Sequence, residues 1–215
     1  MIDYLQSHRT DILDALGQHL TLALLPVVLG FAVALPLGYL AHHYGSLRHP
    51  LLNLSSILYA IPSLALFVLL PLILGTQILD PANIVVALSV YTVALLVRTV
   101  TDGLGSVDAA AIQAATAMGF RPLRRLIQVE LPIAVPVIIA GLRVATVSNI
   151  SLVSVGALIG VGGLGALFTQ GLQLSYLTPI IVGMILSMLL AVVFDLLLVT
   201  LQIALTPWLR AGVKA

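Results

Sequence analysis

The chain has 215 residues, of which 60% are hydrophobic and only 8% are charged, with a net charge of +1. Soluble domains carry about a quarter charged residues, so this composition indicates one integral membrane domain, residues 1–215, with no soluble domain attached. The near-zero charge gives no reason to expect a nucleic-acid partner, and the absence of cysteine excludes disulfides, thiolate metal sites and a cysteine nucleophile.

The N-terminal residues 1–18 carry acids and lack the basic start of a cleaved signal peptide. Apolar Ile2, Leu5, Ile12 and Leu16 recur there at intervals of three or four. This spacing predicts a short amphipathic helix lying at the membrane interface.

Five later segments are long and apolar enough to cross a bilayer, which needs about 20 residues per helix. They are 20–41, 52–75, 83–101, 132–155 and 178–206. Each contains proline, glycine or both, which membrane helices tolerate where neighbours satisfy the freed backbone groups. The sequence therefore predicts an all-α integral membrane protein with about five transmembrane helices.

Basic residues are concentrated on alternate connections. One side holds His42, His43, Arg48, His49, Arg121, Arg124, Arg125, Arg210 and Lys214; the other holds Asp3, Asp11, Asp14 and Asp80, with Arg9 as its only Lys or Arg. The positive-inside rule predicts an outer N-terminus, an inner C-terminus and a cytosolic segment 108–132. The three histidines of the first loop have no carboxylate or cysteine beside them, which favours a solvated loop over a metal site.

Segment 156–176 carries no charge and six glycines. It fits a short re-entrant or interfacial element, with Gly162 and Gly163 as candidate gate residues, because irregular backbone at membrane depth must lie against protein or a wet cavity. The alternative is close helix packing through Gly156 and Gly160. Residues 160–165 also match G-x-G-x-x-G, but no βαβ context accompanies the match, so we do not infer dinucleotide binding.

Arg143 and Asp195 are the charges that lie farthest from the ends of the predicted spans. Each is about 16–22 Å deep at a rise of 1.5 Å per residue. Charges at such depth face a partner or a wet cavity. We hypothesise that the two side chains pair or line a translocation path; the alternative is that each reaches the interface or a hydrogen-bond partner independently.

The fourth span carries a polar arc on one side of its helix. On a helical wheel, the arc covers about 140° and excludes Ser148 and Asn149. Its members are Arg143, Thr146, Ser151 and Ser154. Such an arc indicates either a pore wall or hydrogen bonding between helices.

Segment 108–132 combines a basic group with small residues. Ile112, Ala115, Gly119 and Leu123 follow helical spacing, so two of the four positions on this face are almost bare. Pro122 is expected to bend or end the helix. A solvated connector would not need a small-residue face, so the pattern favours a helix that docks on another protein.

The same segment resembles the cytoplasmic signature of permease subunits of binding-protein-dependent ABC importers. That signature runs Glu-Ala-Ala, three residues, Gly, nine residues, Ile, one residue, Leu-Pro. This chain has Gln113-Ala114-Ala115, Gly119, Val129 and Leu131-Pro132 at the same spacing. Gln113 replaces the glutamate, so a contact there would use shape and hydrogen bonds in place of an ion pair.

The resemblance extends over nearly the whole chain, with five spans as in the small (MetI-like) permeases of methionine and osmoprotectant importers. Ala60 to Leu66 (AIPSLAL) and Ile159 to Gly165 (IGVGGLG) are similar to the glycine betaine, choline and carnitine branch. These stretches add Pro62 and Ser63 to the candidate path residues. The resemblance implies a subunit of the bacterial inner membrane that forms the path for such an osmoprotectant.

The same family resemblance implies a permease dimer, either homomeric or heteromeric, two cytosolic ATPases and an extracytoplasmic solute-binding protein. The chain has no G-x-x-x-x-G-K-[ST] motif, so ATP and Mg would be bound by the ATPase, and no pattern places enzyme chemistry in the spans. The coupling residues that follow from the family resemblance are Gln113, Ala114, Ala115, Gly119, Arg121, Leu131 and Pro132. Alternatives are the same machinery with methionine or another amino acid as cargo, an ATP-independent transporter or channel, and a membrane scaffold.

Overall fold

The computed structural model describes residues 2–208, and all of its regular elements are helical. They are α1 (Ile2–Ser7), α2 (Arg9–His43), α3 (Gly45–Ala60), α4 (Ser63–Leu74), α5 (Pro81–Gly105), α6 (Ala109–Ala117), α7 (Pro122–Arg125), the π-helix η1 (Leu126–Glu130), α8 (Leu131–Gly156), the 3-10 helix η2 (Ala157–Ile159), α9 (Gly165–Gln173) and α10 (Leu177–Leu205). The predicted all-α class is confirmed.

Four helical stretches in this range are long and apolar enough to cross a membrane: α2, α5, the run from Pro122 to Ile159, and α10. The pair α3 and α4 makes a fifth crossing if it is counted as one bent span. The five predicted segments therefore correspond to real helices. Several helices extend beyond the predicted ends, and α5 reaches Gly105 in place of residue 101.

The N-terminal region differs from the prediction of a separate helix over residues 1–18. α1 ends at Ser7, and α2 begins at Arg9 and continues without interruption to His43. Gln18 and His19, at the expected boundary, are hydrogen-bonded to the backbone of residues 163 and 164, so this part of α2 belongs to the bundle. Met1, the first residue of the predicted interfacial helix, lies outside the described residues.

The predicted first loop is also much shorter than expected. α2 ends at His43 and α3 begins at Gly45, so Tyr44 alone separates them, with an extended backbone (φ −109°, ψ 101°). Arg48 and His49 therefore lie in the first turns of α3. The basic residues Arg210 and Lys214 lie outside the described residues.

The second predicted span is broken, and its two halves, α3 and α4, are bent by 102°. Ile61 and Pro62 both have extended backbones, with ψ near 130°. The ring of a proline disfavours the helical conformation in the residue before it, so Pro62 ends α3 and allows α4 to start in a new direction. The prediction of one continuous helix over 52–75 was wrong for this reason.

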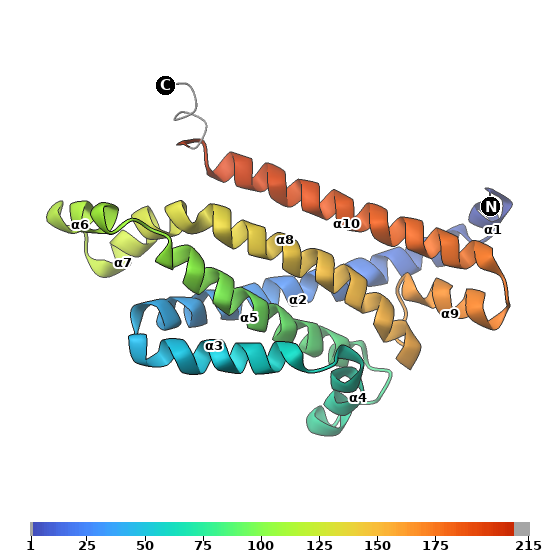
Figure 1. The fold of residues 1–215 in the computed structure, drawn as a ribbon. Helices are drawn as coiled ribbons and strands as arrows, with labels where there is room; N and C mark the ends of the chain where they lie inside the picture. Colours follow the sequence, from blue (N-terminus) through green and yellow to red (C-terminus); the bar gives the residue numbers. More distant parts are fainter. Residues whose placement is uncertain (1, 209–215) are drawn as a thin grey trace.

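Figure 1 shows an elongated bundle in which α5 and α8 are central, α2 runs behind them, and α3 and α10 flank them. α2 packs most extensively along α5. This contact is close because a Cβ atom added at Gly30 or Gly38 would lie within 2.6 Å of Thr92 or Val100 of α5. Small residues at this spacing let membrane helices approach closely.

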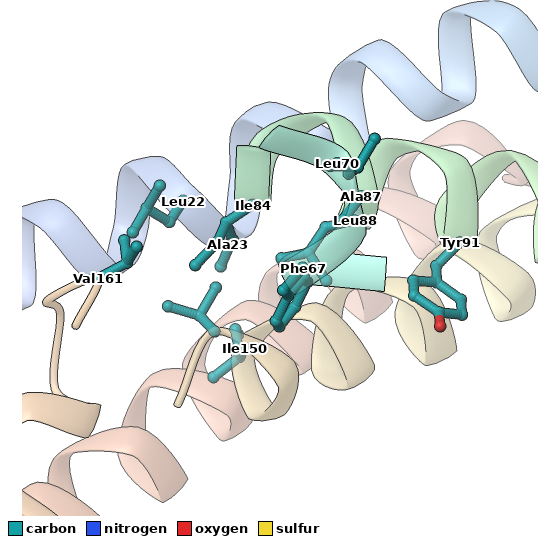
Figure 2. Packing of buried hydrophobic residues seen from close by; sticks show 11 residues of the cluster. Leu22, Ala23, Phe67, Leu70, Ile84, Ala87, Leu88, Tyr91, Ile150 and Val161 are labelled. Carbon is teal, nitrogen blue, oxygen red and sulfur yellow. The ribbon is translucent and has the colours of Figure 1, made fainter. Parts of the chain in front are cut away.

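The core lies where α2, α4, α5 and α8 meet, and Figure 2 shows its side chains. Phe67 of α4 is fully buried against Leu88 and Ile84 of α5 and Ile150 of α8, within one cluster. α4 projects from the bundle in Figure 1, and Phe67 together with Leu70, which is buried in the same cluster, anchors it. Tyr91 lies at the edge of the same cluster, towards α8.

Segment 156–176 combines close packing with irregular backbone, whereas its depth in the membrane stays a prediction. Gly156 packs closely, because an added Cβ would lie 2.2 Å from Ile84 Cδ1. Gly160 and Gly163 have φ values of 89° and 76°, which L side chains rarely adopt, and they form the irregular turns before the short helix α9. The result is a short helix packed against α10 at one end of the bundle.

Candidate coupling segment and translocation face

Segment 108–132 begins with a short, well-capped helix. The Asp108 carboxylate accepts a hydrogen bond from Ala110 N at 2.9 Å, which satisfies one of the free N–H groups at the start of α6. At the other end, Gly119 N donates to Thr116 O and Phe120 N donates to Ala115 O. This bond pair is a Schellman turn, which requires a left-handed residue after the helix.

Gly119 is that left-handed residue, with φ of 82° and open space around the position of a Cβ atom. The helix therefore ends before Gly119, and Pro122 starts α7 in place of ending a longer helix. The predicted face formed by Ile112, Ala115, Gly119 and Leu123 does not exist as one helical surface. Instead, Ala115 is 1% exposed and packs inward.

The exposed surface of this segment is formed by other signature residues. Gln113, Ala114 and Arg121 are exposed, as is Gly119 at the turn. Leu131 and Pro132 start α8 and are half-buried. The signature thus divides into an exposed part on α6 and its turn, and a part that joins the segment to the fourth span.

An ion pair ties the two parts together. Arg125 Nε donates to Glu130 Oε1 at 2.6 Å, and Arg125 Nη1 donates to Thr116 Oγ1 at 3.0 Å. Glu130 is buried, and the intervening η1 has the i to i+5 bonding of a π-helix, with Leu131 N donating to Leu126 O. No role was predicted for Glu130 beyond the start of the fourth span; its charge, opposite to that of Arg125 five residues earlier, was the signal in the sequence for this pair.

Within the spans, Arg143 of α8 and Asp195 of α10 form a bidentate ion pair. Arg143 Nε lies 2.7 Å from Asp195 Oδ1, and Arg143 Nη2 lies 2.8 Å from Oδ2. The pairing hypothesis is therefore confirmed, whereas a role in translocation stays a prediction. Both side chains are about one-third exposed, so the pair lies at the surface of the single chain.

Two further residues of the predicted polar arc also lie beside α10. Ser151 and Ser154 line a cavity of about 260 Å³ together with Ser187 of α10. Thr146 is buried, and its hydroxyl donates to Leu142 O within its own helix. Three of the four arc residues therefore lie at the α8–α10 contact, which contains a small polar cleft.

A second polar surface lies on the other side of α8, where α3, α5 and α8 form a groove. One cavity of about 220 Å³ is lined by Tyr59, Tyr91, Thr92, Ser148 and Asn149, among others. An adjoining cavity of about 670 Å³ shares Tyr59 and also contains Ser55, Ser56, Arg98 and Asp102. We refer to these two cavities as the α3–α5–α8 groove.

Sequence analysis missed most residues of this groove. Ser148 and Asn149 were excluded because they lie outside the wheel arc, yet Asn149 Nδ2 donates to Thr92 Oγ1 at 3.0 Å across α5 and α8. Asp102 was overlooked because the third span was expected to end at residue 101, whereas α5 continues to Gly105. Arg98 lies within the predicted span, and no role was predicted for it. Ser63 lines the groove, and Pro62 forms the break beside it; their role in a translocation path stays a prediction.

Gly162 and Gly163 lie elsewhere, against α2. Gln18 Oε1 accepts from Gly163 N at 2.9 Å, His19 Nδ1 accepts from Leu164 N at 3.2 Å, and His19 Nε2 donates to Ile150 O at 3.0 Å. His19 is fully buried. These bonds clamp the α8–α9 connection to α2, so the two glycines do not line the groove.

This arrangement of apolar crossings, polar groove and signature segment defines a membrane transport subunit. The chain belongs to the family of binding-protein-dependent transport system inner membrane components, whose profile matches residues 22–210. It is therefore a multi-pass permease subunit of the bacterial inner membrane, and membership of this family implies a solute-binding protein and an ATPase as partners.

Several relatives match the chain over almost its whole length. The osmoprotectant import permease protein OsmW of Salmonella typhimurium is 37% identical over 96% of this chain and 97% of that protein. The choline transport system permease protein OpuBD of Bacillus subtilis is 31% identical over 96% and 91%. The glycine betaine/carnitine/choline permease OpuCB of Bacillus subtilis is 31% identical over 100% and 97%.

Two kinds of solved transporter share the fold. An inward-facing structure of the MetNI methionine ABC transporter has a TM-score of 0.82 at 23% identity, covering 91% of this chain and 96% of that chain. An amino acid ABC transporter solved with histidines has a TM-score of 0.77 at 18% identity, covering 93% and 96%. The likeness confirms the predicted MetI-like fold.

Proposed function

We propose that this permease carries osmoprotectants that bear a trimethylammonium group, such as glycine betaine, choline or carnitine. The observation that carries the proposal is the near full-length similarity to an osmoprotectant import permease, at 37% identity, and to permeases named for choline, glycine betaine and carnitine, at 31%. Methionine or another amino acid is the second candidate, because transporters of those solutes share the fold. Their identities are lower, at 18–23%, so the first candidate is favoured.

The translocation path is proposed to lie on the face formed by α3, α5, α8 and α10. Arg98, Asp102 and the Arg143–Asp195 pair all lie on helices of this face and are at least partly exposed. Exposure of such charges to hydrocarbon is costly, so they should face water or another subunit. A second permease subunit, either identical or a sister chain, would supply the opposite wall.

Segment 108–132 is proposed to dock on the ATPase in the cytosol. Two observations support this placement. α6 and α7 lie at the same end of the bundle as the α2–α3 turn, so the predicted basic connections share one side (Figure 1). α7, η1 and α8 also run on from one another without a loop, so a displacement of the segment would be transmitted directly to the fourth span.

The proposed mechanism is alternating access driven by ATP and Mg on the two ATPase subunits. ATP binding closes the ATPase pair, moves the docking segments together and opens the path towards the loaded solute-binding protein. Hydrolysis returns the path to the cytosolic side. Such a cycle requires that ATP and cargo bind the two states with different affinities.

The docking proposal is tested by bulky substitutions on exposed positions. Ala114→Arg adds a long side chain on α6 without straining its backbone. Gly119→Arg adds one at the turn, where the left-handed φ of 82° also strains the backbone of an L residue. Both should abolish co-purification of the ATPase and cargo-dependent uptake. Gln6→Arg, exposed at the opposite end of the bundle, is the control. Retention of both activities by the α6 and turn variants would contradict docking here.

The cargo proposal is tested in liposomes that contain the permease, its ATPase and its solute-binding protein. The importer should accumulate radiolabelled glycine betaine, choline or carnitine when ATP is enclosed, and excess methionine should not compete. ATP-dependent uptake of methionine without uptake of any trimethylammonium solute would establish the second candidate.

A further inference from the structure

The smaller cavity of the α3–α5–α8 groove lies at the break between α3 and α4. Tyr59 and Ser63 approach it from the two sides of the break, Tyr91 and Thr92 from α5, and Ser148 and Asn149 from α8. None of its lining residues is charged, and its volume is about 220 Å³. The cavity is thus uncharged, moderately polar and rich in aromatic surface.

Two tyrosine rings form a corner of this cavity. The rings of Tyr59 and Tyr91 have centroids 6.0 Å apart and planes at 84°. Tyr91 is 6% exposed, and its hydroxyl donates to Ile61 O at the break, which fixes that ring. Tyr59 is 49% exposed and lies at the mouth. The face of an aromatic ring attracts cations through its quadrupole, and Tyr is among the preferred partners of quaternary ammonium groups.

The end of α3 adds to this preference. α3 is 16 residues long and ends at Ala60, beside Tyr59, because of the break at Pro62. The last carbonyl groups of a helix carry a partial negative charge, which favours a cation nearby. Discontinuous membrane helices place such ends at the substrate and ion sites of transporters. Tyr59 and Ile61 line the cavity, so it borders directly on this helix end, while Ser63 lines it from the first turn of α4.

We propose that this cavity binds the trimethylammonium group of the cargo as the cargo crosses the permease, an inference that rests on the proposed osmoprotectant function. The site holds the cation with ring faces and helix-end carbonyls and with no carboxylate. Such a site binds weakly, and a transport path needs binding that is favourable enough for entry and weak enough for exit.

The adjoining larger cavity gives the cargo a continuation beyond this site. The two cavities share Tyr59 and Leu95, and the larger one extends along α5 to Arg98 and Asp102. Arg98 lies seven residues after Tyr91, about 10 Å along the helix. Its positive charge is therefore remote from the aromatic corner. Asp102, which carries a negative charge, lies one turn further along α5.

The test measures binding to the purified permease–ATPase complex in nanodiscs, without the solute-binding protein. Tetramethylammonium and glycine betaine are titrated by calorimetry into wild type, Tyr59→Leu and Tyr59→Phe. The control is Tyr44→Leu, because Tyr44 is 50% exposed, as Tyr59 is, but lies at the α2–α3 turn. Basal ATPase activity confirms that each complex is intact.

We expect Tyr59→Leu to weaken binding about 3- to 5-fold, the loss of one cation–π contact at a half-exposed ring. Tyr59→Phe keeps the ring and should stay within about twofold of wild type, as should Tyr44→Leu. The inference is overturned if the wild-type complex shows no saturable binding, if Tyr59→Leu binds as tightly as wild type, or if Tyr59→Phe loses as much as Tyr59→Leu.

Uptake by the complete importer separates this inference from the proposed function. If wild type imports glycine betaine but the Tyr59 variants bind like wild type, the cavity assignment fails and the proposed function stands. If the binding pattern holds but wild type imports no trimethylammonium solute, the proposed function fails and the cavity remains a trimethylammonium site.

Discussion

The coupling segment and the membrane-spanning region are built by opposite means. In the segment, the stabilising side-chain bonds join residues close in sequence: Asp108 to Ala110, Arg125 to Glu130 and Arg125 to Thr116, at separations of 2, 5 and 9 residues. In the spans, Arg143 bonds to Asp195, 52 residues away, and His19 bonds to Ile150, 131 residues away. The segment can therefore form its shape locally and move as a unit, whereas the spans depend on one another.

We expect the largest loss of assembly and transport when the long-range pair of Arg143 and Asp195 is broken. Asp195→Leu leaves an unpaired guanidinium within the spans, which is costly in a membrane. We expect a severe loss of correctly assembled permease and of uptake, measured by membrane yield and transport. The control is Asp14→Leu, at an exposed site near the start of α2. The charge swap Arg143→Asp/Asp195→Arg should restore assembly, and no recovery would argue against the direct pair.

A smaller loss is expected when the clamp between α2 and the α8–α9 connection is removed. His19→Leu leaves Leu164 N and Ile150 O without their hydrogen-bond partner, at about 1–3 kcal/mol for each buried group. The melting temperature of the detergent-solubilised permease should fall clearly. His49→Leu, an exposed position in α3, should leave it unchanged. Equal melting temperatures for the two variants would contradict a structural role for His19.

The next prediction concerns the link between the coupling segment and α8. Glu130→Gln removes the charge that pairs with Arg125 and should weaken this link by about 1.5–3 kcal/mol, the value of a hydrogen bond to a charged group. Because the bond is local, the melting temperature of the spans should change little. Cargo-stimulated ATP hydrolysis should fall, while the ATPase still co-purifies. A loss of ATPase binding would instead show that Glu130 supports the docking surface itself.

The smallest effect is expected at Gly119. Gly119→Ala places a Cβ atom at a φ of 82°, which costs about 1–2 kcal/mol for an L residue. Gly119→Asn is the matched variant, because Asn tolerates this conformation better than Ala. Uptake should follow the order Gly, Asn, Ala, with unchanged membrane yield. If Asn and Ala are equally impaired, side-chain size at the docking surface, and not backbone strain, explains the requirement for glycine.

The sequence determined the apolar crossings, because a bilayer requires long hydrophobic helices whatever their partners. It also determined the spacing of the coupling signature. The turn at Gly119 was not predicted, because Gly119 was placed on a helical face that was expected to continue to Pro122. Pro62 carried the signal for the break in the second span, and the restriction that it imposes on Ile61 is local.

Only the tertiary structure decided which polar side chains face which neighbour. Arg143, Ser151 and Ser154 face α10, whereas Ser148 and Asn149, on the same helix, face the α3–α5–α8 groove. A helical wheel gives relative angles on one helix but not the directions from which other helices approach. Those directions depend on contacts between distant residues, such as Gly30 against Thr92 and His19 against Ile150. The aromatic corner of Tyr59 and Tyr91 arises from the same long-range packing.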